Sequence, residues 1–376
     1  MADGIKILQS VFGPRDLTPD IQVDGERCVA RLHRRSRCRL CADMCPAGAI
    51  SIDDHVVEVD QDACTHCGAC VTVCPTQAAE STWLPWKELV SGALRAVEES
   101  DGEPILSCED VADDLLPALR RHACVMPCLE RVDEALLLSM AAAGAKRIIL
   151  APGECPSCGI GCRGAAWSLV VEHVEGLLRA VGSEVEIVID TTLFQPDVPA
   201  GEPVVSRRDA LAGIGGDAAR TATNIVEELV RESRYGELAG ALGLFGGDSL
   251  IETASRGQVC AWALGALALR CAGDARSAID RLGESRVPTR VFGEPVIDLQ
   301  ACSNCFLCTA YCHEDAIEKL KDGSKVRGFR ILPHRCNGCG MCVDVCRPDA
   351  LRIDHHVKLA DVLREAPIDI RYEDWK

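Results

Sequence analysis

The residues with the clearest chemistry are cysteines, most of which occur in runs of four. The chain has 376 residues and 24 cysteines. Three runs have the spacing C-x2-C-x2-C-x3-C, and in a fourth run nine residues separate the first two cysteines. The runs are Cys28, Cys38, Cys41, Cys45; Cys64, Cys67, Cys70, Cys74; Cys302, Cys305, Cys308, Cys312; and Cys336, Cys339, Cys342, Cys346. Three thiolates on a tight loop can bind one iron-sulfur cluster while the fourth points toward a neighbouring cluster, so the runs must act in pairs.

A pair of small or aliphatic residues follows each run at the same distance. The pairs are Ala49-Ile50, Ala78-Ala79, Ala316-Ile317 and Ala350-Leu351. We expect each pair to make core contacts at the start of the next strand.

The composition limits the class of protein. A hydrophobic content of 48% over this length predicts two to four folded domains rather than disorder or a small disulfide scaffold. The formal charge is -17, and no long basic face is evident, so a nucleic-acid partner is not expected. The apolar stretch 259–269 is too short to span a bilayer, and residues 1–12 do not resemble an export signal. We therefore expect a cytoplasmic protein whose cysteines bind metal rather than form disulfides.

The runs resemble bacterial two-cluster ferredoxins in residues 21–80 and again in 296–355. The resemblance implies two α+β modules that together hold four [4Fe-4S] clusters, each bound by one group of four cysteines. The first group is Cys28, Cys38, Cys41 and Cys74; the second is Cys45, Cys64, Cys67 and Cys70; the third is Cys302, Cys305, Cys308 and Cys346; the fourth is Cys312, Cys336, Cys339 and Cys342. Structural zinc sites or free core thiols are the alternative, but zinc would not require runs of four cysteines.

Two features depart from the ferredoxin pattern. A proline usually follows the fourth cysteine of a run, but His313 and Arg347 stand in its place here. The proline is not a ligand, so we expect little effect on cluster binding. The long gap after Cys28 and its flanks carry a basic stretch on an acidic protein: Arg27, Arg31, His33, Arg34, Arg35, Arg37 and Arg39. This basic stretch is either a solvated loop or a docking surface for an acidic redox partner.

Between the two modules the pattern changes to alternating strands and helices. Strands are expected at 105–108, 123–126, 146–150 and 185–189, and helices at 115–121, 129–143 and 165–181. Such alternation predicts a parallel sheet with crossover helices.

Several central cysteines follow the predicted strands. Ligands of open α/β sheets gather at the carboxyl edge, so we expect a fifth iron-sulfur cluster there, held by four of five cysteines. The five are Cys108, Cys128, Cys155, Cys158 and Cys162. Cys124 begins its strand and is expected to point elsewhere. A zinc site or structural thiols are the alternative.

Residues 103–182 resemble the delta subunit of the methyl-viologen-reducing hydrogenase of methanogens. The matching features are Cys108 after the first strand, 126–128 (Met-Pro-Cys) before a helix, and 144–146 (Gly-Ala-Lys) before the strand that leads to Cys155. The resemblance implies electron transfer toward a heterodisulfide reductase. That family is associated with a [2Fe-2S] cluster, whereas Cys108 stands alone, so both [2Fe-2S] and [4Fe-4S] remain open.

The predicted organisation has four parts. They are an N-terminal ferredoxin-like module (1–100), an α/β domain (101–195), a helical connector (196–295) and a C-terminal ferredoxin-like module with a tail (296–376). The connector should contain helices near 210–234 and 249–281, with Cys260 and Cys271 as core residues.

No motif for substrate activation is evident, so we expect a non-catalytic electron-transfer subunit of a hetero-oligomeric oxidoreductase. Its partners would carry flavin, molybdenum or tungsten, or resemble heterodisulfide reductase. A freestanding polyferredoxin, a thiol-disulfide enzyme acting at the central cluster and a scaffold for cluster assembly are the alternatives.

Overall fold

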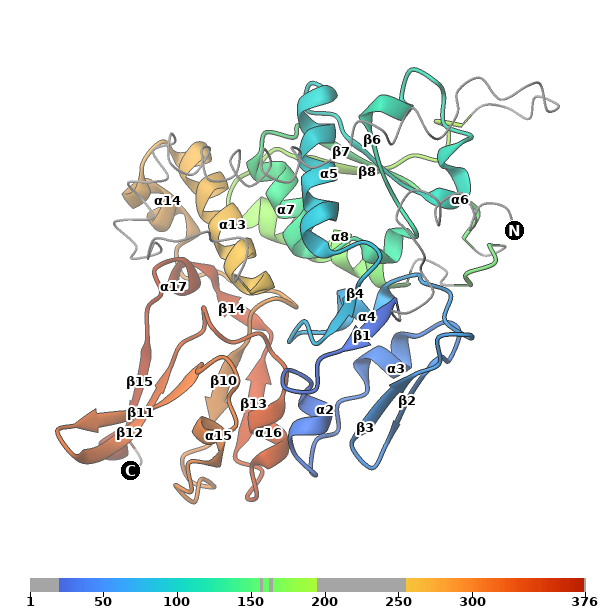
Figure 1. Ribbon diagram of the computed structural model, residues 1–376. Coiled ribbons are helices and arrows are strands. Elements are labelled where there is room, and N and C mark those ends of the chain that lie inside the picture. Colours follow the sequence, from blue (N-terminus) through green and yellow to red (C-terminus); the bar gives the residue numbers. More distant parts are fainter. Residues whose placement is uncertain (1–19, 156–157, 162–164, 195–254, 375–376) are drawn as a thin grey trace.

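The computed structural model describes residues 20–155, 158–161, 165–194 and 255–374. Figure 1 shows a central α/β layer with a smaller module from each end of the chain beside it. Within the described residues, no helix is long and apolar enough to cross a bilayer. The expected helix at 210–234 lies outside the described residues.

The central sheet is parallel and has the strand order β6-β5-β7-β8. Its strands are β5 (Ile105–Cys108), β6 (Ala123–Met126), β7 (Arg147–Ala151) and β8 (Glu186–Ile189). All four predicted strands are therefore confirmed to within one residue. The order reverses between β5 and β7, which is where ligands of such sheets bind.

Helices cover this sheet and form the largest core of the described chain. They are α5 (Trp86–Glu99), α7 (Glu134–Ala142), α8 (Ala165–Ala180), α13 (Arg256–Ala272), α14 (Ala275–Leu282) and α17 (Leu359–Leu363). In α7 almost every side chain is buried, because α5, α8 and α13 all contact it. Residues 249–254 of the helical segment expected over 249–281 lie outside the described residues. The described remainder forms two helices, because Gly273 adopts a left-handed φ of 87° after α13 and Asp274 caps α14.

One predicted helix, 115–121, is wrong. A short helix, α6 (Glu109–Ala112), ends before this range, and the range itself is irregular until the 3-10 turn η1 (Arg120–His122). Pro117 disfavours a helical conformation at Leu116, and the Leu116 amide donates to the carbonyl of Leu193. Leu115 is buried and forms an antiparallel bridge with Phe194, so tertiary contacts oppose a helix here. The helix predicted over 129–143 begins as a second 3-10 turn, η2 (Leu129–Arg131), before α7.

The N-terminal module has the two-fold pattern of strands expected from its two runs. Strand β1 (Ile21–Val23) pairs antiparallel with β4 (Ala79–Ser81), and β2 (Ile50–Asp53) forms a hairpin with β3 (Val56–Val59). Three short helices carry or follow cysteines: α2 (Val29–Leu32), α3 (Leu40–Met44) and α4 (Ala69–Val73).

The C-terminal module repeats this plan and extends it. Strand β10 (Glu294–Ile297) pairs with β13 (Leu351–Asp354), and β11 (Ile317–Asp322) forms a hairpin with β12 (Lys325–Ile331). Its helices are α15 (Leu307–Ala310) and α16 (Met341–Val345).

The C-terminal tail is folded against the rest of the chain. Strand β14 (His356–Lys358) pairs with β9 (Arg286–Pro288), and β15 (Ile368–Arg371) joins the edge of β12 before the turn η3 (Tyr372–Asp374). Helix α17 packs into the central core beside α13. The tail therefore ties the C-terminal module to the central layer.

Candidate iron-sulfur sites

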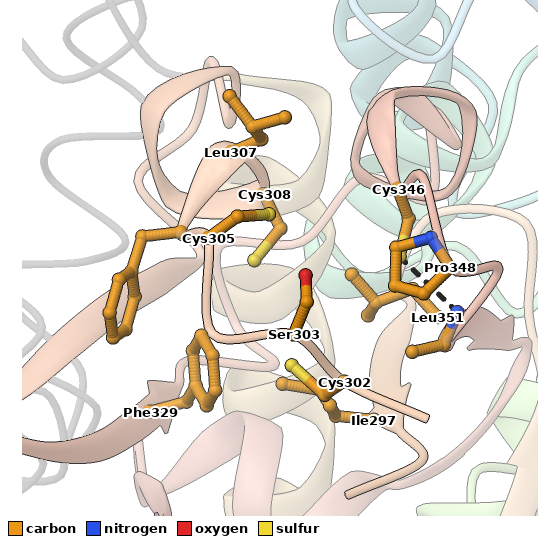
Figure 2. A pocket seen from close by; sticks show the side chains of 12 residues that line it. Ile297, Cys302, Ser303, Cys305, Leu307, Cys308, Phe329, Cys346, Pro348 and Leu351 are labelled. Carbon is orange, nitrogen blue, oxygen red and sulfur yellow. Dashed lines mark hydrogen bonds between the residues drawn. The ribbon is translucent and has the colours of Figure 1, made fainter. Parts of the chain in front are cut away.

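The third cysteine group surrounds one hollow in the C-terminal module. Cys302, Cys305, Cys308 and Cys346 line it together with apolar side chains such as Phe329. Figure 2 shows these cysteines around the hollow. Cys302 and Cys305 lie on the loop that leads into α15, Cys308 lies in α15, and Cys346 follows the end of α16. Cys346 thus reaches across from the other run of the module, as the ferredoxin resemblance implies.

The second cysteine group has the same arrangement in the N-terminal module. Cys64, Cys67 and Cys70 come from one run and Cys45 from the other, and all four line one pocket. Three strands supply an apolar wall of this pocket: Ile21 lies in β1, Ile50 in β2 and Val59 in β3. Four cysteine thiols beside apolar side chains that exclude water are a suitable environment for an iron-sulfur cluster.

The first and fourth groups are also brought together. Burial and the nearby Cys74, Cys38 and Cys28 together raise the pKa of Cys41 to about 12, with burial the largest cause. In the fourth group, burial raises the pKa of Cys339 to about 12, with Cys312 among its neighbours. Burial likewise raises the pKa of Cys336, and both Cys339 and Cys312 add to the effect.

Cys28 lies with its group despite the unusual gap after it. It is buried at the N-terminus of α2, and the residues of the gap form that helix and the loop that returns to Cys38. Burial raises the pKa of Cys28, and the proximity of Cys74 raises it further.

Each run ends in a sulfur atom that accepts a backbone hydrogen bond. The amide four residues later donates to Sγ in all four cases: Ala49 to Cys45 at 3.3 Å, Ala78 to Cys74 at 3.2 Å, Ala316 to Cys312 at 3.1 Å and Ala350 to Cys346 at 3.2 Å. These alanines are buried, and a strand begins directly after each of them, so the repeated pair has the core role expected of it. Hydrogen bonds to sulfur stabilise the thiolate and help to set the reduction potential of a bound cluster.

Two buried arginines, which sequence reasoning missed, lie against the N-terminal module. Arg256 donates from its guanidinium to the carbonyls of Thr72 at 2.7 Å and Val71 at 2.9 Å, and it pairs with Asp133 at 3.2 Å. Arg131 covers Gly68, which lies between two cysteines of the second group. Neither arginine lies in a cysteine run, so no local sequence signal distinguishes them.

Arg131 provides an independent test of whether a cluster fits the second group. Its side chain is buried, and its Nη2 donates to the carbonyl of Leu84 at 2.6 Å. Its Nε and Nη1 are buried without a hydrogen-bond partner among the described residues. A buried donor without an acceptor is costly, and the negative charge of a cluster bound by thiolates would offset that cost. The chemistry of the surroundings therefore fits a bound cluster.

The central cysteines lie past the carboxyl ends of neighbouring strands. Cys108 ends β5 and is paired in register with Met126 of β6, two residues before Cys128. Cys155 and Cys158 follow β7, and Cys162 lies outside the described residues. Cys108 and Cys128 are buried, whereas Cys155 and Cys158 are partly exposed.

Three other cysteines lie away from this edge. Cys124 is buried in the central core, near the carbonyl of Leu89, as expected. Cys260 is completely buried in α13, and Cys271 is partly buried in the same helix. Among the described residues, no three His, Cys, Asp or Glu side chains are placed to share a single metal ion. A [4Fe-4S] cluster does not require this, because each of its four thiolates binds a different iron.

Comparisons with known proteins match both end modules. A family model for the 4Fe-4S dicluster domain matches residues 34–78 and 301–350. No solved structure matches the chain. The resemblance of the central domain to a hydrogenase delta subunit stays a prediction.

Three relatives show the range of proteins that contain such modules. One subunit of the ion-translocating oxidoreductase complex of Methanosarcina acetivorans is 51% identical over 11% of this chain and 16% of its own length. The pyruvate synthase subunit PorD of Thermotoga maritima is 32% identical over 16% of this chain and 56% of its own length. The chain thus spans less than two thirds of both proteins. A ferredoxin of Methanothermococcus thermolithotrophicus is 36% identical over 15% of this chain and 90% of its own length. Through the [4Fe-4S] dicluster domains at its two ends, the chain belongs to the ferredoxin family and is an iron-sulfur electron-transfer protein.

Proposed function

We propose that the chain is an electron-transfer subunit of a multi-subunit oxidoreductase. It would pass single electrons between a partner that carries flavin, molybdenum or tungsten, or that resembles heterodisulfide reductase, and a low-potential acceptor. The observation that carries the proposal is the presence of four cysteine groups in one chain, each drawn from two runs. Two of the relatives are named as subunits of larger enzymes, which supports a subunit role.

The cysteine groups would each hold one [4Fe-4S] cluster, which supplies one-electron chemistry when bound. The chain's own contribution is to hold the thiolates, exclude water and donate hydrogen bonds to sulfur. Cysteine would occupy all four positions of each cluster, so these sites would leave no open iron position for a substrate. The four proposed parts are divided near residues 100, 195 and 295. The two ferredoxin-like modules would have cores of their own, whereas α5, α13 and α17 from the other parts share the core of the central domain.

We further propose that the carboxyl edge of the central sheet holds a fifth cluster, of the [2Fe-2S] or [4Fe-4S] type. Four of the five cysteines named above for this edge would bind it. Cys128 packs beside Cys67 of the second group, so this edge faces a neighbouring cluster site.

Metal analysis of the anaerobically purified chain tests the cluster count. Four [4Fe-4S] clusters predict about 16 irons per chain, and the fifth cluster adds about two to four. Cys128→Ala should lose only this extra iron. Cys124→Ala is the matched control, because Cys124 is also a buried central cysteine but lies in the core, and it should lose none. An iron content well below 16 in the unaltered chain would refute the four-cluster arrangement.

Purification of the tagged chain from its native host tests the subunit role. Recovery of a cofactor-bearing protein at a constant ratio is the expected result. Recovery of the iron-loaded chain alone would favour a freestanding polyferredoxin. A thiol-disulfide enzyme would instead show a reactive thiol at the central edge, detected by alkylation that Cys158→Ser abolishes.

A further inference from the structure

We propose that direct contact between α2 and α16 joins the two ferredoxin modules into one electron path, with Cys38 and Cys339 as the neighbouring ligands at the junction. The inference rests on the proposed function, because it requires that the cysteine groups hold clusters. It adds that electrons pass between the modules inside the chain, without an external carrier.

The apolar part of this junction is buried. Val29 of α2 packs against Met341 and Val345 of α16, although the two helices are about 300 residues apart in sequence. The exposed fractions of these three side chains are only 3%, 1% and 1%. Cys38 of the first group and Cys339 of the fourth pack against this apolar cluster from the two sides. Figure 1 shows α2 beside α16 at the boundary between the blue and red modules.

A charged pair and an aromatic contact surround the apolar contact. The backbone amide and the Nε of Arg37 both donate to the carboxylate of Asp344 in α16, each at 2.9 Å. The side chain of Asp344 is 12% exposed and that of Arg37 is 78% exposed, so the carboxylate is shielded from water but the guanidinium is not. The ring of His33 meets the edge of Tyr311 at 4.8 Å between centroids. Part of the basic stretch after Cys28 thus contacts the C-terminal module of the same chain.

The cysteine groups form a series through this junction. Cys38 of the first group and Cys339 of the fourth pack against the same apolar cluster at the junction. Within the N-terminal module, Cys41 packs against the cluster that contains Cys70, and within the C-terminal module, Cys308 and Cys342 are members of one cluster. The order along the series is therefore third group, fourth group, first group, second group.

The two ends of the series differ. Cys305 of the third group is the exposed cysteine among those described, so this end is accessible to a partner. At the other end, Cys67 of the second group packs beside Cys128 at the central sheet.

The transfer between the modules is a one-electron step. The cluster that gives up the electron is oxidised, the cluster that accepts it is reduced, and no proton or co-reactant is required. The junction thus separates an exposed end of the path from a buried one.

Electron paramagnetic resonance of the full-length chain can detect the junction directly. In a Cys64→Ala/Cys305→Ala variant, only the first and fourth of the four ferredoxin-type groups keep four cysteines, so the two remaining ferredoxin-type clusters lie in different modules. When both are reduced, their spins should interact and split or broaden the signal. A spectrum in which these two clusters give independent signals, in protein with about eight irons in addition to those of the proposed central cluster, would overturn the inference while leaving the cluster assignment intact.

Charge reversal at the junction provides a test that keeps all ligands. In the otherwise unaltered chain, Arg37→Asp places two carboxylates against each other and should reduce the inter-module part of the spin interaction, and Arg37→Asp/Asp344→Arg should restore it. Arg34→Asp is the matched control, because it makes the same charge change at an exposed position of the same loop. An unchanged spectrum in Arg37→Asp, or no recovery in the double variant, would contradict the role assigned to this contact. By contrast, an iron content well below about 16 per unaltered chain would count against the proposed function.

Discussion

At the scale of single residues, the buried cations beside the N-terminal module are expected to tune its clusters. Burial lowers the pKa of the Arg131 guanidinium, whereas Asp133 and Cys70 favour its charged form. The ordinary pKa of arginine is so high that it remains charged. A fixed positive charge stabilises the reduced, more negative form of a neighbouring cluster.

Replacement of this charge should lower the reduction potential of the cluster held by the second group. We expect Arg131→Gln to lower the midpoint potential of this cluster by several tens of millivolts. A buried unit charge beside the cluster site contributes about 1 to 2 kcal/mol, and about 1.4 kcal/mol corresponds to 59 mV for one electron. A redox titration followed by electron paramagnetic resonance measures the shift. Arg131→Lys keeps the charge and should stay near the unaltered value. Equal shifts in both variants would show that packing, rather than charge, is responsible.

The sequence alone identified the cysteines but not these arginines. A cysteine run signals its function through local spacing, because one loop must supply several thiolates to one cluster. Arg131 and Arg256 reach the N-terminal module from the turn η2 and helix α13. Their contacts depend on how distant segments pack, and no pattern within either segment encodes them.

At the scale of elements, the two modules offer a matched comparison at the start of a cysteine-bearing helix. Gly68 precedes α4 with a φ of 78°, and Gly340 precedes α16 with a φ of 77°. A side chain would be strained at either position. A methyl group at Gly68 would also overlap Arg131, whereas at Gly340 it would meet no other atom within 4 Å.

Alanine substitution at these glycines should therefore have unequal effects. Gly340→Ala is expected to cost about 1 to 2 kcal/mol from backbone strain alone. Gly68→Ala adds the displacement of Arg131, about 1 to 3 kcal/mol more, as for other overpacking changes. Anaerobic thermal bleaching of the visible absorbance should occur at a lower temperature in Gly68→Ala than in Gly340→Ala. The same midpoint in both variants would mean that Arg131 moves aside without cost.

The elements of the central sheet were predictable, and one connection was not. The strands are short apolar runs bounded by polar or turn residues, so their hydrophobic pattern specifies them. Residues 115–121 have apolar residues at helical spacing, yet Leu115 is held by a bridge to Phe194, nearly 80 residues later. A contact between segments so far apart overrides the local pattern.

At the scale of the whole molecule, the cores of the end modules differ from the central core. Cysteines of the cluster groups are members of both module cores, whereas the central core consists mainly of aliphatic side chains from α5, α7, α8 and α13. We therefore expect the modules to depend on bound clusters for stability, because the unfolded chain has no preformed site and cluster binding then contributes directly to folding. The central core does not have this dependence.

Removal of iron should unfold the chain unevenly. After anaerobic chelation, amide hydrogen exchange is expected to become fast in residues 20–81 and 294–354. Exchange should remain slow in α7, α8 and α13, whose buried faces contain few cysteines. Mass spectrometry of peptides from both forms resolves these regions. Retained protection in both end modules after complete iron loss would show that their cores are stable without clusters.

The sequence by itself determined the cysteine runs, their pairing into modules and the parallel central sheet, because spacing and hydrophobic period are local properties of the chain. Only the tertiary structure decided which surfaces of the modules meet. The residues between Cys28 and Cys38 look like a charged loop in the sequence, but Val29 and Arg37 contact α16 of the other module. Such a contact depends on the fit between two folded surfaces about 300 residues apart, and neither segment specifies that fit alone.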